Sequence, residues 1–158
     1  MNVKIEDFPA FNVAYIRNVG PYNTIGSAFQ KMGEWVKSAN CCGPETLWLG
    51  AYHDCPKSTP PEKCRADACV TVPADFKADG VVQLQTIPAG RYASYLVGIR
   101  PEDAAVDFAK RWEELSAWVA KNSLQGDPAR PGIEVYYNCA FACPIKKWVV
   151  DICIPIIG

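Results

Sequence analysis

Residues 67–72, DACVTV, return in altered form as residues 151–156, DICIPI, so a β-rich segment repeats at an offset of 84. The same offset places Tyr52 over Tyr136. A single match between strands is weak evidence, because strands draw on few residue types. Two matches in the same order at one offset indicate a duplicated module.

The repeat extends toward the start of each half. Residues 8–10, FPA, match residues 87–89, IPA, at an offset of 79, and each is followed by a β-rich run, residues 13–18 or 92–99. Helical patterns come next, with apolar residues at three- and four-residue steps. The apolar positions are Ile25, Phe29, Met32 and Val36 in the first helix, and Val106 or Phe108, Trp112, Leu115 and Val119 in the second.

These patterns predict an α+β fold made of tandem strand-helix-strand-strand modules, about 1–74 and 81–158. We expect segment 75–80 to join them and 56–62 and 139–146 to be hairpin loops. One module alone would leave a side of its sheet uncovered, so the two should pack as a single ligand-binding domain, 1–158. We expect a pseudo-twofold axis between the modules and a ligand cleft along it.

Composition excludes several classes of protein. The chain has 158 residues, of which 49% are hydrophobic, enough for one domain with a sizeable core. The net charge is −1 and the basic residues are scattered, so direct nucleic-acid binding is not expected. The start of the chain does not resemble an export signal, and no apolar run is long enough for a bilayer. We expect a cytoplasmic protein whose eight cysteines are reduced thiols.

Alternation along the strands separates two faces of each predicted sheet. We assign the more apolar set of each strand to the face that the helix covers. The opposite faces then carry Trp48, Tyr52 and Asp67 in the first half, and Glu134, Tyr136, Asp151 and Cys153 in the second. His53 has the parity of the helix-covered face, where a packed, hydrogen-bonded histidine is expected.

Aromatic rings beside carboxylates suit a flat or cationic guest, through stacking and cation–π attraction. These residues are therefore the predicted ligand-binding set. The plain alternative is that they are ordinary solvent-facing residues of a half-exposed sheet. The residues alone give the two interpretations equal weight.

Four segments carry a family resemblance: 18–22 (NVGPY), 66–73 (ADACVTVP), 131–138 (PGIEVYYN) and 148–156 (WVVDICIPI). Together they resemble the gyrase-inhibitory-protein-like small-molecule-binding family, which also supplies the effector domain of AraC-type and multidrug-responsive transcription regulators. The resemblance implies two such modules with a ligand cleft, and cleft acids at positions matching Glu134 and Asp151. The family commonly has Glu in place of Asp151 and an aromatic residue in place of Cys153, so ligand preference or pocket width is expected to differ.

The resemblance also implies an enzymatic alternative, because some stand-alone relatives resemble hydrolases that open strained electrophilic rings of toxic natural products. In that case Glu134 or Asp151 would activate water, and Tyr136 would donate a hydrogen bond or proton. Whether the protein is an enzyme stays open, with binding favoured.

A metal site is a third alternative, since several thiols accompany the one histidine. Its candidate ligands would be His53, Cys55, Cys64, Cys69, Cys139 and Cys143. No paired C-x-x-C motif is present, so we expect no metal and no cofactor. The tryptophans of the predicted helices, Trp35, Trp112 and Trp118, are assigned to core packing.

The function predicted from these features is sequestration or sensing of an amphipathic aromatic compound, with cations favoured. Ring-opening hydrolysis is the alternative. The family name adds a protein partner such as a topoisomerase or a regulator.

Overall fold

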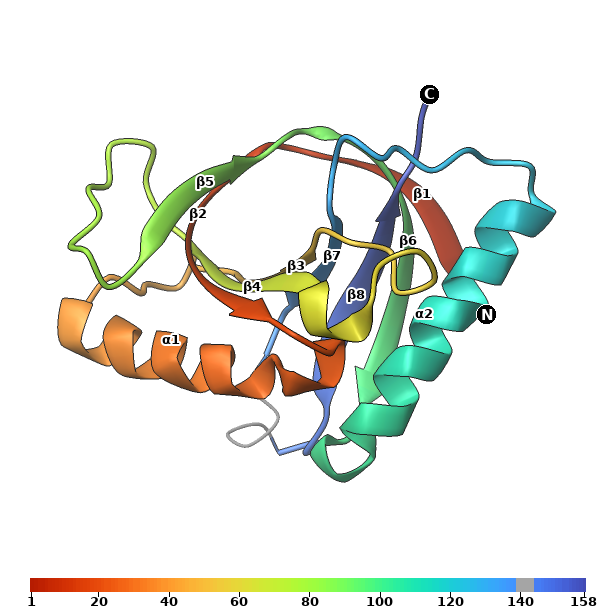
Figure 1. Cartoon of the computed structure of the whole chain (residues 1–158). Helices are drawn as coiled ribbons and strands as arrows, with labels where there is room; N and C mark the ends of the chain where they lie inside the picture. The colour runs from red at the N-terminus through yellow and green to blue at the C-terminus, as the bar shows by residue number, and fades with distance from the viewer. Residues whose placement is uncertain (139–143) are drawn as a thin grey trace. The chain divides into compact units, whose positions relative to one another are not determined.

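The computed structural model describes residues 1–138 and 144–158, which contain eight strands and two α-helices (Figure 1). The strands are β1 (Val3–Phe8), β2 (Phe11–Val19), β3 (Trp48–Tyr52), β4 (Arg65–Thr71), β5 (Gln83–Ile87), β6 (Gly90–Ile99), β7 (Gly132–Tyr136) and β8 (Trp148–Pro155). The helices are α1 (Gly26–Ala39) and α2 (Ala104–Lys121). The predicted α+β class is confirmed. Residues 139–143, part of the second expected hairpin loop, lie outside the described residues.

The chain forms two compact units. One unit, Ala10–Pro88, contains α1 and an antiparallel sheet of order β3-β4-β2-β5. The other unit, Met1–Pro9 with Ala89–Gly158, contains α2 and an antiparallel sheet of order β1-β6-β8-β7. Each unit therefore contains four strands and one helix.

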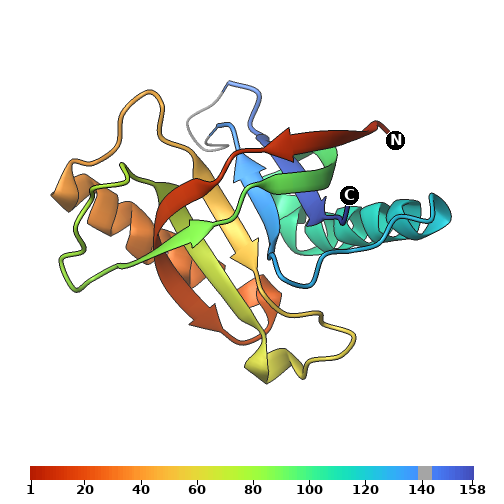
Figure 2. The same cartoon turned by 90° about the horizontal axis from the view of Figure 1, so that it is seen from above.

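Strands β1 and β5 are exchanged between the repeats. β1 begins the chain but pairs with β6, and β5 follows the first repeat in sequence but pairs with β2 rather than with β6 (Figure 2). The chain passes from one unit to the other after Pro9 and again after Pro88. Proline has no N–H for a strand ladder, so both strands end there. The repeat in the sequence and the compact units therefore divide the chain at different places.

In unit Ala10–Pro88, α1 packs on one face of the sheet. Its buried residues Ala28, Met32 and Trp35 meet β2 and β4 in a core that also contains Ala14, Ala68, Val70 and Val82. The segment after β4 adds Phe76, whose ring stands edge-on to Trp35 at 5.9 Å. The indole Nε1 of Trp35 donates a 2.8 Å hydrogen bond to Asp79 Oδ2. The segment between β4 and β5 thus helps to cover α1.

In the other unit, α2 packs on β6 and β8 (Figure 2). Its buried residues Leu115 and Val119 belong to the predicted apolar face of the helix. They meet a strand core of Ala93, Tyr95, Val97, Ile99, Val150, Ile152 and Ile156. The three- and four-residue periodicity therefore identified the buried face of this helix correctly.

The assignment of faces is wrong for β3 and β7. Trp48 lies opposite Val70, and Tyr136 lies opposite Val150. Directly opposed residues of an antiparallel pair share a face. Val70 packs with α1 and Val150 with α2, so the side chains of Trp48, Tyr52, Glu134 and Tyr136 lie on the helix-covered faces.

The reason is that both faces of β3 and β7 are buried. Leu49 and Ile133, the apolar residues assigned to the helix side, are fully buried on the other face, opposite Cys69 and Cys153. Apolar character therefore could not identify the side that meets the helix. Asp67, Asp151 and Cys153 do lie on the faces away from the helices, as predicted.

In residues 1–138 and 144–158, no helix combines the length and the apolar character that crossing a membrane requires.

Candidate functional site

A buried carboxylate is the centre of the candidate site. Glu134, on β7, is only 2% exposed. Trp112 on α2 donates a 2.7 Å hydrogen bond from Nε1 to Glu134 Oε1. The Tyr136 hydroxyl donates a 2.6 Å hydrogen bond to Oε2. Both carboxylate oxygens thus accept hydrogen bonds from neutral donors on aromatic side chains.

Trp112 and Tyr136 contact this carboxylate, and two further rings adjoin Tyr136. Phe108 and Tyr136 have ring centroids 6.3 Å apart, Phe108 and Trp148 6.2 Å, and Tyr136 and Trp148 6.4 Å. We call Phe108, Trp112, Tyr136 and Trp148 the aromatic box. Its members come from α2, β7 and β8, which all belong to one unit. Such rings offer negative faces to a cation and flat surfaces to an aromatic guest.

Local sequence explains how the box is built. Phe108 and Trp112 are four residues apart on α2 and so lie on the same face of the helix. Gly132, at the start of β7, lets the indole of Trp112 approach the strand. A Cβ at Gly132 would lie 2.9 Å from Trp112 Cη2, closer than a side chain allows.

The structure brings together the predicted residues Glu134 and Tyr136. It adds Trp112, Phe108 and Trp148, which the sequence analysis did not place in the site. The four-residue spacing of Phe108 and Trp112 was visible, but the same spacing is typical of core packing. Only the position of α2 over β7 shows that Trp112 contacts the carboxylate.

Asp151 and Cys153 lie on the opposite face of this sheet from Glu134. Asp151 is 8% exposed and accepts a 2.7 Å hydrogen bond from the Tyr137 hydroxyl. Burial and that bond to Asp151 raise the pKa of Tyr137 well above its usual range. Burial likewise raises the pKa of the Cys153 thiol, which has no exposed surface and stays protonated at neutral pH. Our expectation that Glu134 and Asp151 share a face is therefore wrong.

Asp67, in the other unit, is fully buried and heavily bonded. Arg17 donates from Nε to Oδ1 at 2.8 Å and from an Nη atom to Oδ2 at 3.0 Å. His53 Nε2 lies 2.6 Å from Oδ2, and Gln85 Nε2 donates to Oδ2 at 2.8 Å. Burial alone would raise the pKa of Asp67, but these bonds outweigh it and lower the pKa to about 2. His53 thus lies on the face away from α1, a correction to its predicted place.

Trp48 and Tyr52 are held within unit Ala10–Pro88. Trp48 packs against the core under α1, and the ring of Tyr52 stands edge-on to Tyr22 at 5.0 Å. The position that matches Glu134 at the offset of 84 is Gly50. A Cβ at Gly50 would lie 2.9 Å from the Tyr52 hydroxyl. The repeat therefore carries the carboxylate in one unit and a glycine beside a tyrosine ring in the other.

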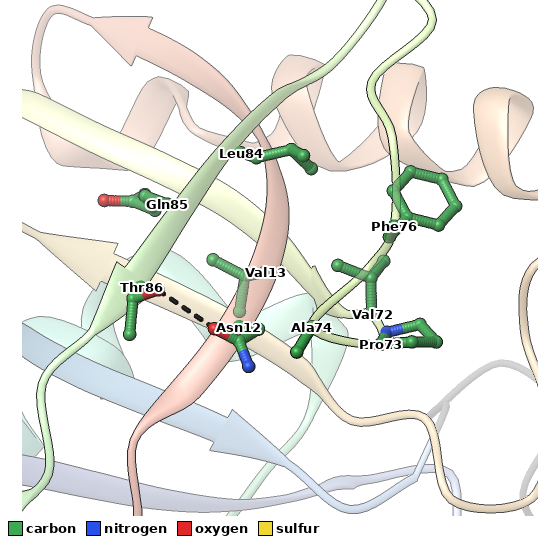
Figure 3. Close-up of a pocket in the computed structure, with 9 residues that line it drawn as sticks. All are labelled: Asn12, Val13, Val72, Pro73, Ala74, Phe76, Leu84, Gln85 and Thr86. Atoms are coloured by element: carbon green, nitrogen blue, oxygen red, sulfur yellow. Dashed lines mark hydrogen bonds between the residues drawn. The ribbon is translucent and has the colours of Figure 1, made fainter.

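A separate small pocket of about 170 Å³ lies along β2, β5 and residues 72–76 (Figure 3). Its lining residues are Asn12, Val13, Val72, Pro73, Ala74, Phe76, Leu84, Gln85 and Thr86. Thr86 Oγ1 donates a 2.9 Å hydrogen bond to Asn12 Oδ1. The lining contains no ionisable side chain, so this pocket does not share the chemistry of the Glu134 site.

Among residues 1–138 and 144–158, no group of three or more His, Cys, Asp or Glu side chains is placed to hold a metal ion. Cys139 and Cys143, two of the candidate ligands, lie outside the described residues. The six described cysteines are free thiols.

The family model of the GyrI-like small molecule binding domain matches residues 1–157. The chain belongs to this family. The match confirms the resemblance found in the sequence and gives this GyrI-like domain a role in binding small molecules. The chain is 32% identical to DNA gyrase inhibitor 1 of Dickeya dadantii, over 99% of both chains.

Solved structures share the fold of this GyrI-like domain. The C-terminal domain of EcmrR matches with a TM-score of 0.77 at 18% identity, over 99% of this chain and 98% of that one. SAV2435 bound to tetraphenylphosphonium matches with a TM-score of 0.69 at 13% identity, over 100% and 95%. At these identities the likeness shows the fold alone.

Proposed function

We propose that this GyrI-like domain binds an amphipathic aromatic cation at Glu134, inside the aromatic box. The observation that carries the proposal is a carboxylate 2% exposed that accepts hydrogen bonds from two aromatic side chains, one of which packs in a cluster of further rings. A cationic guest at this carboxylate gains both charge attraction and contact with aromatic rings.

The chemistry of a structural neighbour supports this ligand class. Tetraphenylphosphonium, bound to SAV2435, is a hydrophobic cation with aromatic rings. It is the first probe that we would use. An amphipathic cation of this kind matches the mixture of rings and carboxylate at Glu134.

Binding requires side chains to move. Because Glu134 is almost fully buried, a guest reaches it only if the side chains that cover it move, and Trp112 and Tyr136 are in direct contact with the carboxylate. The indole of Trp112 then changes environment. Titration with tetraphenylphosphonium should therefore change tryptophan fluorescence, and Trp112→Phe should remove most of that change.

The deciding experiment compares Glu134→Gln with the wild type. The amide keeps the shape of the side chain but removes its charge. We expect the affinity for tetraphenylphosphonium to fall by about 1.5–3 kcal/mol, roughly ten- to a hundredfold, as for other hydrogen-bonded charges. Binding of a neutral aromatic of similar size should change little.

Asp151→Asn is the matched control, because Asp151 lies on the other face of the same sheet. It should leave the affinity near that of the wild type. Unchanged affinity in Glu134→Gln would refute the proposed site. An equal loss of affinity in both variants would mean that the overall negative charge of the protein, and not the position of Glu134, attracts the cation.

Ring-opening hydrolysis is a second candidate function. It is favoured by the 2.6 Å hydrogen bond between Tyr136 and Glu134, which pairs a proton donor with a carboxylate that could activate water. If this function holds, Tyr136→Phe keeps cation binding but loses turnover of a strained electrophilic ring. Absence of turnover in the wild type would remove this candidate.

A protein partner is a further part of the proposal, supported by the name of the Dickeya relative. We propose that the domain acts on a topoisomerase or a regulator, with the bound cation as signal. Supercoiling by purified gyrase should fall as the protein is added, and tetraphenylphosphonium should change that inhibition. If supercoiling stays unchanged when this protein is in molar excess over gyrase, gyrase is not the partner.

A further inference from the structure

Two adjacent cysteines follow helix α1. Cys41 and Cys42 are both free thiols, the first half-buried and the second exposed. Cys41 packs against the core under α1, which contains Trp35. Both cysteines belong to unit Ala10–Pro88, whereas Glu134 belongs to the other unit. The pair is therefore a chemical feature separate from the carboxylate site.

The backbone on both sides of the pair is held by hydrogen bonds. Asn40 ends α1 in the left-handed conformation, with φ of 48°, and its N–H donates to the Val36 carbonyl at 3.0 Å. Beyond the pair, the Gly43 N–H donates to Thr46 Oγ1 at 2.9 Å, and the Thr46 N–H donates to the Gly43 carbonyl at 3.1 Å. The two cysteines thus lie between a helix end and a closed turn, on a backbone that is already ordered.

The two thiols lie close to each other. Burial raises the pKa of the Cys41 thiol, and Cys42, which is near enough to form a hydrogen bond with it, raises this pKa further. A direct disulfide between neighbours is strained, because a bond of about 2 Å must close across one planar peptide. An atom that bonds to both sulfurs leaves them further apart and avoids this strain.

We propose that Cys41 and Cys42 chelate a monosubstituted trivalent arsenical, a soft centre that takes two sulfur ligands. Each thiol gives its proton to a hydroxyl on arsenic. One R–As(OH)₂ and two thiols then form two arsenic–sulfur bonds and release two waters. Arsenic stays trivalent throughout, so the step needs no oxidant and no reductant.

The number of available ligands favours this class of guest. Within residues 1–138 and 144–158, no third His, Cys, Asp or Glu side chain joins the pair to complete a metal-binding group. Structural zinc takes four protein ligands. A centre that already carries one carbon substituent and needs only two sulfurs matches the pair.

Chelation distinguishes this site from a single exposed thiol such as Cys55. Once Cys42 has bound arsenic, the Cys41 thiol is presented to the same atom at an effective concentration on the millimolar order or above. A monothiol in solution must exceed that concentration to displace the arsenical. A dithiol chelates arsenic itself and displaces it more readily.

Native mass spectrometry of protein loaded with one equivalent of phenylarsine oxide tests the proposal. The parent protein carries Cys139→Ser and Cys143→Ser, because these two thiols lie outside the described residues. We expect it to keep one phenylarsenic group in 2-mercaptoethanol and to lose it in dithiothreitol. Cys42→Ser changes an exposed side chain and should release the group at a monothiol concentration at least about tenfold lower.

Cys55→Ser is the matched control, because Cys55 is also exposed but has no neighbouring cysteine in the sequence. It should keep the group as the parent does. Cys41→Ser should behave like Cys42→Ser, with circular dichroism to check that it folds. The proposal is overturned if the parent releases the group as readily as Cys42→Ser, or if Cys55→Ser weakens retention to the same extent. Glu134→Gln should leave retention unchanged, so this test is independent of the cation site.

Discussion

Two buried acids illustrate how neighbouring side chains decide the role of a carboxylate. Asp67 accepts hydrogen bonds from Arg17 and Gln85 and contacts His53. Glu134 accepts from Trp112 and Tyr136, which are neutral. A guanidinium already compensates the charge of Asp67, so this residue holds β2 and β4 together. At Glu134 the hydrogen-bond donors of the aromatic box are neutral, and we propose this carboxylate as the group that attracts a cationic ligand.

Asp67→Asn should destabilise the protein and flatten its pH dependence at low pH. The folded-state pKa of Asp67 is about 2, below the usual value of an unfolded aspartate. The ionised group therefore stabilises the fold above about pH 4, and this contribution, about 2–3 kcal/mol, is lost as the pH falls toward 2. Urea unfolding of both proteins between pH 2 and 6 measures it. An identical pH profile in the variant would contradict the assignment.

Thiol reactivity should follow burial. Cys42 and Cys55 are exposed, whereas Cys69 and Cys153 have no exposed surface and have pKa values raised by burial. Because the thiolate is the reactive form, iodoacetamide should label the first pair quickly and the second pair only after unfolding. Peptide mapping by mass spectrometry resolves each site. If Cys153 were labelled as fast as Cys55, the strand face that carries Cys153 would be accessible to the reagent.

At the scale of the element, α2 serves two purposes along one helix. Leu115 and Val119 anchor it to β6 and β8, and Phe108 and Trp112 belong to the aromatic box. The site is therefore built on a rigid element rather than on a loop. Its geometry depends on how closely α2 approaches β7.

Gly132→Ala tests that approach. The added methyl would meet the ring of Trp112 and push it away from Glu134, at a cost of about 1–3 kcal/mol in packing. Tetraphenylphosphonium affinity and tryptophan fluorescence should both change. Gly126→Ala is the control, because its Cβ would lie at an ordinary 3.9 Å from the nearest atom, the Pro155 carbonyl oxygen. Equal effects in both variants would argue against a specific role of the Trp112 contact.

At the scale of the whole molecule, strand exchange links the beginning of the chain to its second repeat. Each unit takes its edge strand from the other repeat, β1 for one sheet and β5 for the other. The stability of the α2 unit therefore depends on residues 3–8, at the start of the first repeat.

Removing residues 1–9 should uncover the edge of β6. We expect faster hydrogen exchange in β6, because its pairing with β1 is lost, and unchanged exchange in β2, whose partners are β4 and β5. Removing residues 1–2 alone, which precede β1, is the control. Faster exchange in β2 to the same extent as in β6 would show that the strand exchange does not govern local stability.

The sequence by itself determined the repeat, the two helices with their buried faces, the α+β class and the family. These features rest on local periodicity and on residue matches at fixed offsets, which need no knowledge of distant contacts. That Glu134 and Tyr136 share one face of their strand was also predicted in this way, since acids and rings on a strand are visible in its pattern; their role in ligand binding stays a prediction.

Only the tertiary structure decided which face of β3 and β7 meets a helix, because Leu49 and Ile133 are fully buried on the side away from the helices. Alternation divides a strand into two sets of side chains but does not say what covers each set. The partners of β1 and β5, and the contact of Trp112 with Glu134, join residues far apart in sequence. Such contacts are set by how complete elements pack, and no local pattern records them.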